Sequence, residues 1–190
     1  MSRLEADQSG GEQPCATARV AGSPHGGGRL RRFAVLTLAT AGGVGYAPVA
    51  PGTAGSAVGV AIYALLASGG ALAVGLAALL ASGLGVWSAG AAERLFGRGD
   101  DGRIVIDEVA GQLVALWPLA LLAPEGRACA PLPLCVGFLA FRALDVAKPG
   151  PVGWAERRFH GGAGVIADDL VAGALAALVV AGTVLAGLAS

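Results

Sequence analysis

A stretch of 60 residues without a charged side chain, between Arg32 and Glu93, constrains this sequence more than any other feature. In an average soluble domain about a quarter of the residues are charged, whereas only 14% of this chain is charged and 55% is hydrophobic. Such a stretch is difficult to place on a water-exposed surface. It favours segments that lie in a lipid bilayer over the alternative, a soluble helical domain rich in Ala and Leu.

The overall composition indicates closely packed membrane helices. The chain contains 32 glycines but only 5% aromatic residues, and small residues allow helices in a membrane to approach one another closely. The formal net charge is zero, so the overall charge does not indicate a nucleic-acid partner. The three cysteines lack the spacing of a metal site and are predicted to be free thiols.

The apolar segments predict an all-α fold, a polytopic membrane bundle of about four to five helices. Crossing about 30 Å of hydrocarbon takes roughly 20 residues, with about 17 as the lower limit. The segments that meet this limit are residues 71–92, 104–124, 128–146 and 170–190. A shorter apolar segment, residues 54–68, is predicted to form the first membrane helix.

A loop rich in Gly and Pro precedes that first helix. Residues 42–56 contain two prolines and five glycines, a composition that argues against regular helix. The segment is therefore predicted to be a structured cytoplasmic or re-entrant loop. Thr53 or Ser56 is expected near the N-terminus of the helix that follows.

Charge placement predicts the domain organisation and the orientation in the membrane. Residues 1–28 are polar, lack apolar periodicity and are expected to form a disordered tail without a signal peptide, which leaves residues 29–190 as the membrane domain. Arg and Lys gather in short cytoplasmic loops, and among the loop cations only Arg127 falls on the other side. Residues 42–56, 94–108 and 142–169 are therefore predicted to meet at the cytoplasmic face.

The first acidic cluster is Asp107 and Glu108, at the start of a predicted helix. Carboxylates at this position complement the helix dipole, worth about 0.3 to 1 kcal/mol each, and that effect alone could account for them. Ionisable groups inside membrane segments are costly, however, and therefore mark functional sites. We accordingly interpret the pair as candidate metal ligands.

The second cluster is Arg142, Asp145 and Lys148, which recur every three residues and share one helical face. They could form an ordinary ion-pair ladder at the membrane boundary. Alternatively, the two cations could hold phosphate oxygens while Asp145 binds metal. Two prolines, Pro149 and Pro151, are expected to end this helix.

The third cluster combines His160 and the glycines Gly161 and Gly162 with Asp168 and Asp169. Glycines before a helix leave backbone N–H groups open to an anion, although a flexible loop with a solvated histidine would have the same composition. Since residues from 170 onward are apolar, at least one of the two aspartates should face the bundle interior.

Together the clusters offer oxygen ligands, cations and one histidine, which suits Mg²⁺ with phosphate better than zinc or copper. A membrane transporter or channel with a carboxylate-lined ion site is the alternative function. The long apolar runs argue against it, because the charges gather at one face rather than near the middle of the membrane.

Four ordered motifs resemble the phosphatidylglycerophosphatase A family. They are GxGxxPxAPGTxGS (residues 43–56), DxxxIVxDExxG (100–111), RxxDxxKPxP (142–151) and HGGxGxxxDDxxAG (160–173). The resemblance covers about residues 30–190. Val152, where the family often has isoleucine, and the long polar N-terminus are mild departures.

The resemblance implies a Mg²⁺-dependent lipid phosphatase of the bacterial cytoplasmic (inner) membrane that converts phosphatidylglycerophosphate to phosphatidylglycerol, with the active site facing the cytoplasm. It implies a phospholipid substrate and no obligatory protein partner. The acidic and basic residues of the three clusters all match the family pattern. The expected metal ligands are Asp107, Glu108, Asp168 and Asp169; the expected catalytic residues are Asp145, His160, Arg142 and Lys148; the expected substrate contacts are Arg142, Lys148, Thr53, Ser56, Gly161 and Gly162.

Overall fold

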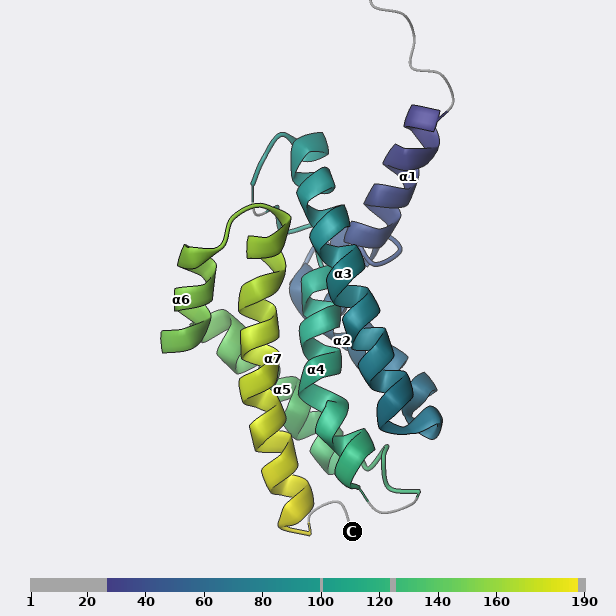
Figure 1. The fold of residues 1–190 in the computed structure, drawn as a ribbon, viewed down its shortest axis with the longest axis vertical. Helices are drawn as coiled ribbons and strands as arrows, with labels where there is room; N and C mark the ends of the chain where they lie inside the picture. Colours follow the sequence, from purple (N-terminus) through teal and green to yellow (C-terminus); the bar gives the residue numbers. More distant parts are fainter. Residues whose placement is uncertain (1–26, 100, 124–125, 188–190) are drawn as a thin grey trace, which may run out of the picture.

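The computed structural model describes residues 27–99, 101–123 and 126–187, and the regular secondary structure of these residues is all helical, without a strand among them (Figure 1). The α-helices are α1 (Gly27–Ala39), α2 (Pro51–Leu66), α3 (Gly70–Phe96), α4 (Ile106–Leu122), α5 (Pro131–Ala147), α6 (Gly150–Arg158) and α7 (Gly162–Leu185). Two 3₁₀ turns, Val44–Tyr46 and Ala67–Gly69, lie on either side of α2. The all-α prediction is confirmed.

Helix α4 is the centre of the bundle, with α2, α3, α5 and α7 packed around it (Figure 1). Its leucines Leu113, Leu116 and Leu119 are buried in the core. Burial on several faces explains why α4 is apolar nearly all round. Side chains at the N-terminal end of α4 can therefore meet side chains from several other helices.

Among the described residues, two helical stretches are long and apolar enough to cross a membrane. They are Pro51–Phe96, which covers α2 and α3, and Gly162–Leu185, and their most apolar 18-residue windows have mean hydropathies of 2.1 and 2.0. Large apolar side chains such as Leu65, Leu72 and Leu178 are exposed on the outside of the bundle, as expected where a helix faces lipid. The number of crossings, four to five from the sequence, stays a prediction.

The start of α2 corrects one prediction. Regular helix was not expected in residues 42–56, yet α2 begins at Pro51. Proline is well tolerated at the first helical position, where its missing N–H has no partner to lose. Thr53 and Ser56 do lie in the first turns of α2, but Ser56 donates its hydroxyl proton back to the carbonyl of Gly52 and neither residue caps the helix.

Helix boundaries differ elsewhere too. Helix α7 begins at Gly162, so part of the glycine-rich segment that was expected to form a turn before Asp168 and Asp169 is itself helical. The amphipathic α1 and the short α6 were not predicted from the sequence, because neither is long enough to cross a membrane. The expected disordered tail lies outside the described residues up to residue 26, while residues 27 and 28 begin α1.

Candidate active site

A compact turn positions the N-terminus of α4. The carboxylate of Asp101 accepts hydrogen bonds from the Arg103 side chain at 2.7 Å from both Nε and Nη2, and Val105 N–H donates to the carbonyl of Ala39 in α1. The side-chain hydrogen bond from Arg103 lowers the pKa of Asp101 to about 2. Asp101 therefore stays ionised and paired with Arg103 at neutral pH. This pair holds the loop that leads into the first turn of α4.

Close helix packing brings α7 alongside the N-terminal part of α4. A side chain at Gly173 would collide with the backbone carbonyl of Gly111, and one at Gly111 would lie 2.7 Å from the carbonyl of Asp169. Only glycine at these positions lets the two backbones touch. Asp169, 4% exposed, is thereby held against the start of α4.

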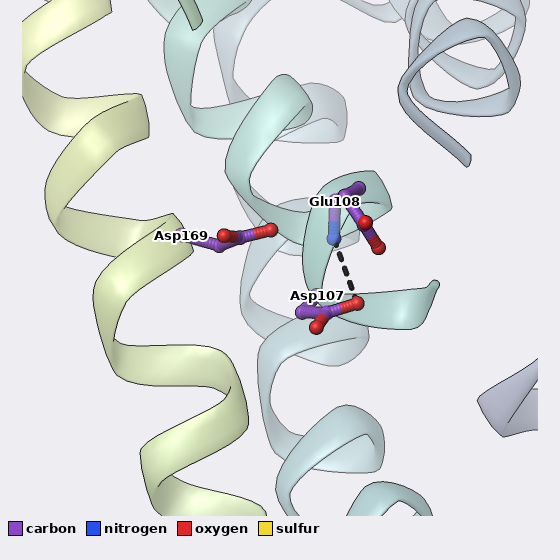
Figure 2. Close-up of side chains that lie close together, drawn as sticks. All are labelled: Asp107, Glu108 and Asp169. Carbon is purple, nitrogen blue, oxygen red and sulfur yellow. Dashed lines mark hydrogen bonds between the residues drawn. The ribbon is translucent and has the colours of Figure 1, made fainter. Parts of the chain in front are cut away.

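Three carboxylates converge as a result. Oxygen atoms of Asp107, Glu108 and Asp169 all lie within 4.8 Å of one another, and Figure 2 shows Asp169 reaching from α7 toward the two acids of α4. Within the trio, the Glu108 N–H donates to Asp107 Oδ1 at 3.1 Å. We refer to these residues as the carboxylate cluster.

The donor set of the carboxylate cluster fits a hard divalent cation. Glu108 Oε2 and Asp169 Oδ2 are buried without a hydrogen-bond partner among the described residues, although buried polar atoms are normally paired. Three neighbouring carboxylates also repel one another. A cation such as Mg²⁺, which prefers carboxylate oxygens, would provide a partner for the two buried oxygens and would offset the repulsion among the carboxylates.

A cavity of about 320 Å³ opens beside the cluster. It is lined by residues from five helices and their connecting loops: Glu93, Asp107, Glu108, Asp145, Lys148, Glu156, Phe159, His160, Gly161, Gly164, Val165, Asp168 and Asp169. The carboxylate cluster thus forms one wall of a space large enough for a phosphate-bearing head group. His160 is exposed on its rim.

Lys148 is a basic residue that lines this cavity. It is the C-cap of α5, with a left-handed φ of 44°, and its Nζ donates to Asp168 at 2.8 Å and to Glu156 at 2.7 Å. Burial acts to lower the pKa of Lys148, but the hydrogen bonds to these carboxylates outweigh it and raise the pKa above its ordinary value. Lys148 therefore carries a positive charge at neutral pH.

Arg142 lies near Glu108, next to Gly52 at the start of α2. Its Nη1 donates to Asp145, and a Cβ built on Gly52 would lie 3.2 Å from its Nη2 and against the Glu108 carboxylate. Gly52 therefore makes room where α2, α4 and α5 meet. The predicted shared face of Arg142 and Asp145 is confirmed, whereas Lys148 lies beyond the end of the helix.

The structure brings most of the expected site residues together. Asp145, Lys148, His160, Gly161 and Asp168 line the same cavity as the carboxylate cluster. Both Asp168 and Asp169 are buried, which confirms the expectation that at least one faces inward. Asp168, expected to bind metal, lies outside the cluster and pairs with Lys148.

Four expected residues do not line the cavity: Arg142, Thr53, Ser56 and Gly162. Thr53 is exposed, Ser56 is fully buried, and Gly162 packs against Gly90 of α3. Their substrate contacts stay predictions.

Glu93, Glu156 and Gln112 were not among the site residues expected from the sequence. Glu93 and Glu156 line the cavity, while the fully buried amide of Gln112 has no hydrogen-bond partner among the described residues. A polar residue one turn after Glu108 in an apolar helix was the available signal for Gln112.

Comparisons with known proteins identify the family of this chain. The family model of phosphatidylglycerophosphatase A matches residues 37–184. The chain is 34% identical over 140 residues to phosphatidylglycerophosphatase A of Escherichia coli K12, covering 74% of this chain and 77% of the relative. It is 29% identical over 156 residues to the protein of that name in Haemophilus influenzae, covering 80% and 91%.

Another relative differs in the lipid that its name specifies. A Bacteroides thetaiotaomicron protein that carries the provisional name phosphatidylinositol-3-phosphatase is 33% identical over 154 residues, covering 78% of this chain and 92% of that protein. No solved structure matches the chain. The family model spans every cluster that lines the cavity, and the chain belongs to the phosphatidylglycerophosphatase A family.

Proposed function

We propose that this chain hydrolyses the terminal phosphate monoester of phosphatidylglycerophosphate, giving phosphatidylglycerol and inorganic phosphate, in a Mg²⁺-dependent reaction at the cytoplasmic face of the bacterial inner membrane. The observation that carries the proposal is the carboxylate cluster, with unpartnered oxygens on Glu108 and Asp169, beside a cavity that also presents Lys148 and His160. Family membership supports the lipid.

Asp107, Glu108 and Asp169 would hold the metal, and Asp168 is the fourth proposed ligand. When bound, Mg²⁺ acts as a Lewis acid that offsets the charge of the phosphate oxygens. The protein contributes the geometry: the Asp101–Arg103 turn and the contact between Gly111 and Gly173 fix where the carboxylates lie. A fixed arrangement requires little reorganisation when substrate arrives.

The remaining residues would bind and protonate the substrate. Lys148 would hold non-bridging phosphate oxygens as a point charge, and Arg142 could do so with a planar fork. In the structure Arg142 holds Asp145, which serves in the proposal either as a further ligand or as the attacking group. His160, at the cavity rim, would protonate the leaving glycerol oxygen.

The distribution of basic residues supports a cytoplasmic site. Glu93 and Glu156 line the cavity, and Arg94, Arg157 and Arg158 follow them directly in sequence. Arg127 lies at the opposite end of α5, before Pro131. Because Arg and Lys accumulate on the cytoplasmic side of membrane proteins, the cavity end of the bundle is assigned to that side.

Phosphate release from phosphatidylglycerophosphate by the purified chain in detergent micelles tests the proposal. We expect release with Mg²⁺, and we expect excess EDTA to abolish it and added Mg²⁺ to restore it. Metal-independent release would contradict the metal assignment. A folded sample that releases phosphate from neither this lipid nor phosphatidic acid would refute the phosphatase assignment and would favour a flux assay for transport.

A further inference from the structure

An apolar groove of about 480 Å³ lies between α2 and α5. Ala57 and Val60 form its α2 wall, and Leu134, Cys135, Phe138 and Leu139 contribute most of its α5 wall. Its volume falls in the range of about 300 to 1,000 Å³ that is typical of small-molecule sites. Since its lining lacks charge and hydrogen-bonding side chains apart from a thiol, it suits a hydrocarbon chain.

The groove begins next to the active site. Phe138 and Leu139 precede Arg142 on α5 by about one helical turn, or roughly 5 Å along the axis. On the facing wall, Ala57 follows Gly52, at which Arg142 and the Glu108 carboxylate meet α2. The groove therefore starts one to two helical turns from the place where Gly52 of α2 and Arg142 of α5 lie near the Glu108 carboxylate.

A second apolar groove, of about 460 Å³, has a different position. It lies between α3, α4 and α7, and its α3 lining includes Leu79 and ends at Ser82, roughly 16 Å along the helix from Glu93. Leu170, the residue after Asp169, also lines this second groove. The proposed phosphate-binding cations, Arg142 and Lys148, both belong to α5 or its C-cap, so a lipid held by them extends most directly along the α2–α5 groove.

We infer that the α2–α5 groove binds an acyl chain of the phospholipid substrate; this inference rests on the proposed function. Moving an acyl chain from the bilayer into an apolar groove adds little hydrophobic free energy, because lipid tails are as apolar as the groove. The contribution of the groove is positional. A chain held there places the phosphate against the carboxylate cluster in a reproducible geometry, and such positioning increases the rate.

Filling the groove tests the inference. Ala57→Phe on α2 and Cys135→Phe on α5 each place a ring in the groove from an opposite wall, and both positions are exposed. Leu132→Phe is the matched control, since Leu132 lies on the exposed surface of α5 outside the groove lining. Each variant is assayed on phosphatidylglycerophosphate with dioleoyl chains and with dihexanoyl chains, the latter too short to fill the groove.

For the two groove variants we expect kcat/KM on the dioleoyl substrate to fall by about tenfold or more, since a misplacement of about 1 Å can cost about 100-fold, while kcat/KM on the dihexanoyl substrate changes less than about twofold. Leu132→Phe should change neither. Equal loss on both substrates, or no loss on either, in the groove variants would overturn the inference. If the unaltered chain cleaves neither substrate, the proposed function itself fails, and the inference fails with it.

Discussion

At the scale of single residues, Asp107 is the most direct test of the site. Asn has the same shape but no charge, so Asp107→Asn removes a ligand from the carboxylate cluster with little change in packing. We expect phosphate release to fall by more than about 100-fold, beyond the loss typical of a residue that only supports a ligand. In the absence of Mg²⁺ the melting temperature should stay the same or rise, because one of three mutually repelling carboxylates is neutralised.

Glu156→Gln is the matched control for that variant. Glu156 lines the same cavity but is about half exposed and lies outside the cluster. We expect it to retain most of the activity, as measured by phosphate release alongside the melting temperature. Full activity in both Asp107→Asn and Asp169→Asn would refute the assignment of the metal site.

At the scale of elements, the contact between α4 and α7 depends on Gly173. An added methyl group at this position would collide with the carbonyl of Gly111, and overpacking of this kind typically costs about 1 to 3 kcal/mol. We therefore expect Gly173→Ala to lower the melting temperature in detergent and to reduce activity, since the helix that moves carries Asp169.

Gly182→Ala is the control on the same helix. Nothing lies within 4 Å of a Cβ at Gly182, and alanine favours helix over glycine by about 1 kcal/mol. This variant should be as stable as the unaltered chain or more stable. Equal melting temperatures for the two variants would show that the α4–α7 contact does not require glycine at position 173.

At the scale of the whole molecule, metal binding should stabilise the fold, because the cluster joins α4 to α7 and exists only when the helices are packed. A ligand present at 100 times its Kd adds about 2.7 kcal/mol to the stability of the folded state. We expect Mg²⁺ to raise the melting temperature of the purified chain and to have little effect on Asp169→Asn. An equal rise in both proteins would place the stabilising metal elsewhere.

The sequence alone predicted the helical class, the apolar segments and the acidic clusters, because these depend on local periodicity and on the cost of charge in lipid. Helix ends were less predictable. Proline at position 51 argued against helix, yet it begins α2. The glycines before Asp168 suggested a loop, whereas α7 already begins at Gly162, where this glycine packs against Gly90 of α3.

Tertiary structure alone decided which acids share a site. Asp107 and Glu108 are neighbours in the chain, but Asp169 joins them only because Gly111 and Gly173 let α4 and α7 touch. The adjacent Asp168 points to Lys148 instead, since successive helical residues face directions about 100° apart. Composition and motif spacing determine that this chain forms apolar helices with acidic ends, and only the packing of those helices selects the carboxylates that converge.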